Sequence, residues 1–280
     1  MGESIPEDHK LDTTVRMRSV RAQPMQRALQ AARKVPEVTI FFWIIKLLTT
    51  GMGETTSDYL VYHINPYLAV LLCAAGLVVA LVLQFIAPRY IAWVYWLAVV
   101  MVAIFGTMAA DVMHIVLKVP YQDSALLFAV ALAIIFTGWY ASERTLSIHS
   151  ITTRRRELFY WAAIMATFAL GTATGDMTAS TFRLGYFGSG VLFAVLFALP
   201  AVGYWLLGVN EILAFWFAYI MTRPLGASFA DWLGKPQSFS GLGLGTGQIS
   251  LVLAVFIIGF VGYLTVTHAD TKGSTTRARR

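Results

Sequence analysis

The sequence predicts an all-α membrane protein of eight transmembrane helices, arranged as four parallel helical-hairpin repeats. Three observations predict this class. The 280 residues are 58% hydrophobic and only 13% charged, whereas soluble domains average about 25% charge. Apolar runs long enough to span a bilayer recur along the chain. One motif, an aromatic-Trp pair followed by Gly and Asp at fixed distances, occurs four times.

The composition also limits the function. So little charge excludes an ordinary cytosolic enzyme, a disordered chain and a nucleic-acid-binding domain. We interpret the net charge of +6 as a topology signal, because basic residues of membrane proteins collect in cytoplasmic loops and tails. The single cysteine, Cys73, lies in an apolar run, so no internal disulfide is expected.

The apolar runs define the expected spans in order. A bilayer core of about 30 Å requires about 20 apolar residues in a helix. The spans are expected at 38–60, 66–87, 91–117, 124–143, 157–180, 187–208, 211–232 and 247–268. The first is the least apolar, because it contains Lys46, Glu54 and Asp58.

The basic residues predict the orientation. With a cytoplasmic N-terminus, seven of the 21 Lys and Arg residues lie in the N-terminal tail and nine in later cytoplasmic segments. We therefore expect both termini in the cytoplasm. The predicted domains are a basic tail (1–35), a transmembrane domain (36–268) and a second basic tail (269–280). The repeats within the transmembrane domain are expected at about 36–90, 91–150, 151–209 and 210–268.

Four segments, 41–60, 94–113, 159–178 and 214–233, align without gaps. In each, Gly follows the Trp by ten residues and Asp follows it by fifteen. The Trp residues are Trp43, Trp96, Trp161 and Trp216; the Gly residues are Gly53, Gly106, Gly171 and Gly226; the Asp residues are Asp58, Asp111, Asp176 and Asp231. A plainer helix follows each segment, so the unit is a hairpin. Parallel hairpins predict pseudo-fourfold or pseudo-twofold symmetry about the membrane normal.

The repeated Gly and Trp residues have structural interpretations. Gly allows transmembrane helices to pack closely, or it bends a helix and exposes its backbone to a ligand. The Trp residues are expected to be interfacial anchors or packing groups.

Positions 3, 7, 11 and 15 residues after each Trp share one helix face. Its outer half is polar or small in every repeat, and its inner half is charged only in the first and fourth. Charges at such depth usually face a bundle interior or an aqueous cavity. We expect this face to line a transport pathway that includes Thr50, Thr107 and Thr172, with Lys46 and Arg223 controlling its charge balance.

The outer end of this face predicts a cation site. The pairs Asp111/His114 and Glu54/Asp58 each place two candidate ligands on one helix face. An oxygen-rich set of this kind suits Mn²⁺, Mg²⁺ or Zn²⁺, so a bound divalent ion is the one cofactor that the sequence suggests. The candidate ligands are Glu54, Asp58, Asp111, His114, Asp176 and Asp231. The alternative is that each Asp ends its own helix at the outer interface.

The opening of the first repeat resembles a known family. The residues are Lys34-Val35-Pro36-Glu37-Val38-Thr39-Ile40-Phe41-Phe42-Trp43, then Lys46, Thr49-Thr50, Gly53-Glu54 and Asp58. They are similar to the start of bacterial multi-pass "membrane-anchored" proteins built from a repeat of unknown function. The resemblance covers most of residues 34–268 and implies a bacterial inner-membrane location. Repeats two to four lack the Lys and the Glu.

The leading hypothesis is a transporter or channel for a divalent metal or for protons, with the bilayer and the transported cation as partners. A non-catalytic scaffold or sensor is an alternative, and it predicts a closed axis with each Asp satisfied locally. An intramembrane enzyme acting on lipid or quinone is another, and it predicts a lateral cleft holding at least two carboxylates. The sequence leaves a homo-oligomer open and predicts no nucleic-acid partner.

Overall fold

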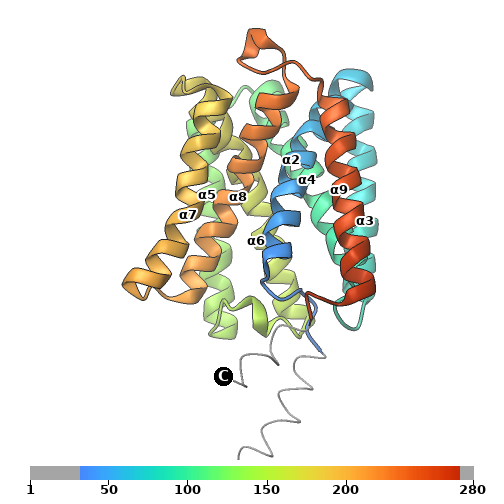
Figure 1. The fold of residues 1–280 in the computed structure, drawn as a ribbon, viewed down its shortest axis with the longest axis vertical. Coiled ribbons are helices and arrows are strands. Elements are labelled where there is room, and N and C mark those ends of the chain that lie inside the picture. Colours follow the sequence, from blue (N-terminus) through green and yellow to red (C-terminus); the bar gives the residue numbers. More distant parts are fainter. Residues whose placement is uncertain (1–31, 272–280) are drawn as a thin grey trace, which may run out of the picture.

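The computed structural model describes residues 32–271, and within that range it contains eight long α-helices and no strand (Figure 1). The helices are α2 (Ile40–His63), α3 (Pro66–Ile86), α4 (Ala92–Asp111), α5 (Tyr121–Glu143), α6 (Arg154–Asp176), α7 (Gly185–Leu207), α8 (Glu211–Gly234) and α9 (Thr246–Thr267). They lie where the eight apolar runs predict them. The predicted basic tails fall mostly outside the described residues.

Local sequence explains where several helices begin. Thr39, Asn65, Thr153 and Asn210 each cap a helix by accepting a hydrogen bond from a backbone N–H of its first turn. Asn65 is followed by Pro66, whose fixed φ and missing N–H suit the first helical position. The polar positions between the apolar runs are therefore helix starts as well as loop residues.

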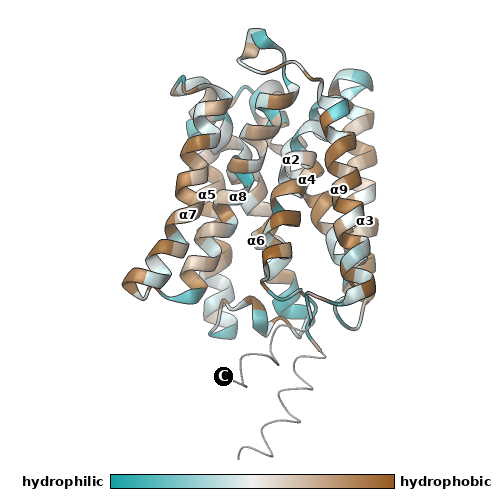
Figure 2. Ribbon diagram, viewed as in Figure 1, coloured by the Kyte–Doolittle hydropathy of each residue, from teal (hydrophilic) through white to brown (hydrophobic). Residues whose placement is uncertain are grey.

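Within residues 32–271, seven helices are long and apolar enough to cross a membrane. These are Pro66–Ile86, Ala92–His114, Tyr121–Glu143, Arg154–Thr181, Gly185–Leu207, Glu211–Gly234 and Thr246–Thr267. Figure 2 shows hydrophobic residues along α7 and α9, with hydrophilic residues gathered near the ends of the bundle. Such a surface is typical of a multi-pass membrane protein.

Helix α2 is the exception among the eight expected spans. It is long enough, but Lys46 and Glu54 with several Thr, Ser and Gly residues make it less apolar than the others. Most of its polar side chains do not face outward. Lys46, Thr50 and Glu54 are buried, because α2 lies against α4, α8 and α9. Its low hydropathy therefore reflects a central position.

The first helix of each repeat belongs to an inner ring. Helix α2 contacts α4, α4 contacts α6, α6 contacts α8, and α8 contacts α2, so the four helices form a closed ring. Each outer helix packs mainly on the inner helix of the next repeat: α3 on α4, α5 on α6, α7 on α8, and α9 on α2 (Figure 1). Every repeat is thus joined to its successor, and the last is joined to the first.

The repeated glycines lie where neighbouring inner helices approach. A Cβ atom on each would meet the residue seven positions after the Trp of the next repeat: Ala103 for Gly53, Phe168 for Gly106, Arg223 for Gly171, and Thr50 for Gly226. Gly53 and Gly106 would place that atom 2.5 Å and 2.9 Å from the neighbouring Cβ. The helices continue through these positions, so the glycines permit close packing.

The end of the bundle at which α2 begins is called here the tail end. The segment before α2 stabilises this end by contacts with other helices. Lys34 Nζ lies 2.5 Å from Glu157 Oε2, and both side chains are buried. Gln84 Nε2 donates to Glu157 Oε1 at 2.9 Å. Glu37 N donates to Asp270 O at 3.1 Å, which brings the two ends of the described chain together. The opening motif of the first repeat therefore ties α3 and α6 to the start of α2.

Candidate functional site

Each inner helix turns one face toward the axis of the ring, called here the axial face. At the tail end, aromatic rings on these faces close the axis. The residue before each Trp lies four positions before the first residue of the predicted face, so it shares that face. Phe42, Tyr95 and Tyr160 are buried there, and Phe215 packs on Phe42 with ring centroids 6.1 Å apart. The hydroxyl groups of Tyr95 and Tyr160 lie 2.5 Å apart.

Lys46 follows on the same face. Its side chain is 1% exposed, and Nζ lies 4.0 Å from the ring centroid of Phe168 and 4.2 Å from that of Tyr219. No hydrogen-bond partner for Nζ exists among the described residues. The ring faces attract the ammonium through their quadrupoles.

Arg223 of α8 binds all three other inner helices. Its Nη2 donates to Glu54 Oε2 at 2.7 Å, to Thr172 Oγ1 at 2.7 Å and to Thr107 Oγ1. Glu54, Thr107 and Thr172 occupy the same repeat position, eleven residues after the Trp. The guanidinium is fully buried, so these bonds form where they are strongest.

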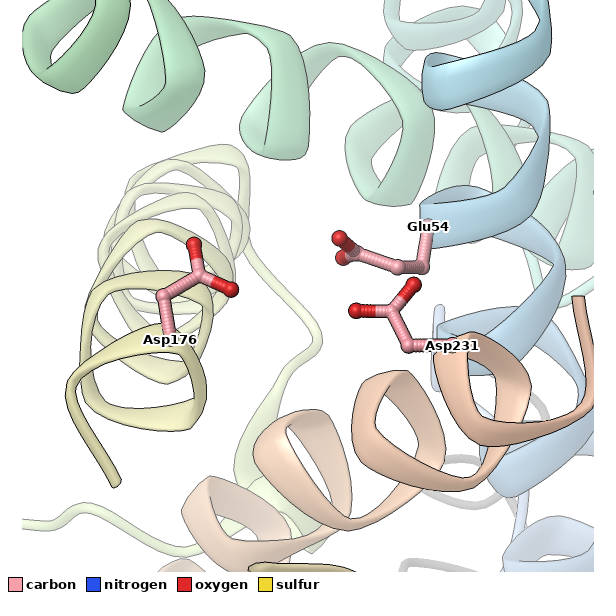
Figure 3. A group of neighbouring side chains, drawn as sticks. All are labelled: Glu54, Asp176 and Asp231. Atoms are coloured by element: carbon pink, nitrogen blue, oxygen red, sulfur yellow. The ribbon is translucent and has the colours of Figure 1, made fainter. Parts of the chain in front are cut away.

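Three carboxylates converge beyond Arg223, at the end of the bundle called here the aspartate end. One ligand oxygen each from Glu54, Asp176 and Asp231 lies within 4.8 Å of the other two. Figure 3 shows them directed at one another from α2, α6 and α8. Oxygens that bind one Ca²⁺ at roughly 2.3–2.6 Å lie at most about 5 Å apart, and those that bind Mg²⁺ lie at most about 4.2 Å apart, so the set matches a larger ion directly and a smaller one after the side chains close in. Asp231 Oδ1 is buried without a hydrogen-bond partner among the described residues.

Lys235 is a site residue that sequence reasoning did not select. Its Nζ lies 3.0 Å from Asp231 Oδ2 and 3.3 Å from Asp58 Oδ2. Burial lowers the pKa of Lys235, but the carboxylates of Asp231 and Asp58 outweigh burial and raise it well above its ordinary value. The signal was present in the sequence, since Lys235 follows Asp231 by four residues.

Asp58 and Asp111 lie beside the converging set but outside it. Asp58 pairs with Lys235, and Asp111 is half-buried at the last position of α4. Single π-helical turns, Val112–Val116 and Met177–Thr181, follow directly after Asp111 and Asp176. Such turns are rare and often mark functional positions, so the aspartate end is locally distorted in repeats two and three.

The structure does not bring the histidines into the acidic set. His114 Nδ1 lies 3.1 Å from Val119 O, and Nε2 lies 3.4 Å from Ser124 Oγ. His63 is exposed and stacks on Tyr59 with ring centroids 4.0 Å apart. Both rings therefore have local partners.

The repeated Trp residues pack inside the bundle. Trp96, Trp161 and Trp216 are buried, and Trp43 is half-buried against Phe197 and Phe215. Trp216 Nε1 also donates to Leu146 O at 2.9 Å. Their recurrence reflects the packing of one repeat on another.

The fold and this site define a helical repeat protein with an apolar exterior and an acidic cluster on the axis of four inner helices. A family model described as "Repeat of Unknown Function (DUF347)" matches residues 41–90, 94–145, 159–209 and 214–270, and the chain belongs to this family. The four matches begin at the same residues as the four segments aligned from the sequence, which confirms the internal repeat. No curated protein and no solved structure matches the chain.

Proposed function

We propose that this protein transports a cation, either a divalent metal or protons, across the bacterial inner membrane along the axis of its inner ring. All eight helices span the bilayer, with pseudo-fourfold symmetry about the membrane normal and both termini in the cytoplasm. The tail end then faces the cytoplasm and the aspartate end faces outward. The observation that carries the proposal is the convergence of Glu54, Asp176 and Asp231 on one buried point.

The charge distribution supports a cationic cargo. With every group ionised, Glu54 and the four repeated aspartates place five carboxylates at the outer part of the axis, against the two basic groups Arg223 and Lys235. An excess of negative charge in a site of low dielectric attracts cations strongly. The aromatic rings at the tail end close the axis on the other side, which favours alternating access over an open channel.

The two alternatives have less support. A scaffold predicts a closed axis, which agrees with the aromatic rings at the tail end, and aspartates that are each satisfied locally, whereas Asp231 Oδ1 has no partner among the described residues. A lipid-modifying enzyme predicts carboxylates in a lateral cleft. A lateral groove of about 410 Å³ between α2 and α9, lined by Phe41 and Phe260 among others, holds no carboxylate. A pocket of about 700 Å³ at the tail end holds two carboxylates, Glu37 and Asp270, but none of the repeated aspartates.

Removing two ligands tests the proposal. In proteoliposomes, Glu54→Gln combined with Asp176→Asn is expected to reduce Mn²⁺ or proton flux at least about tenfold, because the loss of two charged ligands costs more than the 1.4 kcal/mol that tenfold weaker binding requires. The measurement is uptake of Mn²⁺, and of protons under an imposed pH gradient.

The matched control is Asp123→Asn, because Asp123 is exposed in the first turn of α5 and lies outside the axial face. This variant should transport at the wild-type rate. Unchanged flux of both ions in the double variant would show that these carboxylates do not bind the cargo.

A further inference from the structure

Lys46 has a buried amine without a counter-ion in the part of the chain that the structure describes. Its Nζ has no hydrogen-bond partner among the described residues, although the residue is 1% exposed. A charged side chain at this depth costs several kcal/mol. The rings of Phe168 and Tyr219 attract the ammonium form and offset only part of that cost.

The groups around Lys46 include one charge, and it has the same sign. From α8 the site is faced by Tyr219 and Arg223, and from α6 by Phe168. Lys46 Nζ and Arg223 Cζ lie 4.0 Å and 5.5 Å from the centroid of the same Phe168 ring. The phenols of Tyr95 on α4 and Tyr160 on α6 lie one axial layer nearer the tail end. On α2 itself the nearest acid is Glu54, two turns away and bound to Arg223.

In this arrangement, the protonation of Lys46 depends on whether the charge of Arg223 is neutralised. A guanidinium stays protonated in proteins, whereas a lysine amine can lose its proton when buried. While Glu54 neutralises Arg223, the ammonium of Lys46 is tolerated between two ring faces. When Glu54 no longer pairs with Arg223, two like charges face one ring, and Lys46 is the one that can become neutral.

We propose that Lys46 is a proton-binding site whose proton is exchanged for the cation held by Glu54, Asp176 and Asp231. This inference rests on the proposed transport function and adds its coupling ion. An arriving cation binds the Glu54 carboxylate and displaces Arg223 from it. The N–H bond of Lys46 then breaks, its electron pair stays on Nζ, and the proton passes to water. When the cation leaves, Arg223 returns to Glu54 and Nζ takes a proton from water.

A proton suits this position better than an anion does. The flanking faces of Phe168 and Tyr219 carry negative partial charge, which stabilises an ammonium and repels chloride. The ring faces therefore favour a proton on Nζ over a bound anion at this position.

The test measures Mn²⁺ entry and proton exit together, in proteoliposomes loaded with a pH-sensitive dye. Wild-type protein should move protons outward as Mn²⁺ enters. Lys46→Met should still admit Mn²⁺ down its gradient, with loss of the coupled proton movement. Lys118→Met is the control, because Lys118 is exposed outside the helices, and it should behave as wild type. Lys46→Gln gives the same comparison with a polar side chain if the Met variant does not fold.

The outcomes separate the two proposals. Proton exit at the wild-type ratio in either Lys46 variant overturns the role of Lys46 and leaves cation transport standing. No Mn²⁺ or proton flux in the wild type overturns the transport function itself. Replacing chloride by gluconate should leave the proton movement unchanged, and a requirement for chloride would overturn the proton site in favour of an anion site.

Discussion

Arg223→Met is expected to destabilise the bundle by about 3–5 kcal/mol, the usual cost of removing one partner of a buried ion pair. The loss is large because the guanidinium satisfies Glu54 of α2, Thr107 of α4 and Thr172 of α6 at once. Without it, Glu54 becomes an unpaired charge with 2% exposure. The measurement is the free energy of unfolding, or the midpoint of thermal unfolding, in detergent.

A second substitution identifies the cause of that loss. Glu54→Gln in the Arg223→Met background removes the orphaned charge, so the double variant should be more stable than Arg223→Met alone. Arg89→Met is the control, since Arg89 is exposed at the tail end, and it should change stability little. A double variant no more stable than the single one would mean that packing, rather than charge, is what Arg223 supplies.

Gly53→Ala is expected to cost about 1–3 kcal/mol through overpacking. The added methyl would lie 2.5 Å from Ala103 Cβ and 2.8 Å from the Ala103 carbonyl carbon, and backbone cannot move aside as a flexible side chain can. Helices α2 and α4 would have to separate, which would also disturb the axial bonds of Arg223. Thermal unfolding in detergent measures this loss.

Gly259→Ala provides the matched comparison. A Cβ atom at Gly259 meets nothing within 4 Å, so the same substitution on α9 should not reduce stability. Because Ala favours a helix more than Gly does, equal losses at Gly53 and Gly259 would contradict overpacking between α2 and α4 as the cause.

The sequence was sufficient to predict the eight helices, because apolar runs of the length that a bilayer requires leave few alternatives. The repeat was equally accessible, since Trp, Gly and Asp recur at constant spacing. The axial face followed from the helical period alone, and Lys46, Glu54 and Arg223 are indeed buried on it.

Other features depend on distances between side chains of different helices, which the spacing of residues along one helix does not determine. Glu54 lies with Asp176 and Asp231, whereas Asp58 and Asp111 at the repeated position lie outside the set. Lys235 pairs with Asp58 and also with Asp231, and π-helical turns follow Asp111 and also Asp176, so local structure does not distinguish the aspartates inside the set from those outside it. His114 is satisfied by Val119 and Ser124, which reach it only because the chain turns between α4 and α5.

The closed contact order of the helices has a consequence for biogenesis. Helix α2, the least apolar of the eight, is synthesised first, yet the helices that cover it from the other end of the chain, α8 and α9, are synthesised last. Under the proposed topology, in which α2 also spans the bilayer, Lys46 and Glu54 enter the bilayer before Arg223 exists to pair with Glu54. Insertion of this protein depends on holding one polar helix in a protected place until translation is complete.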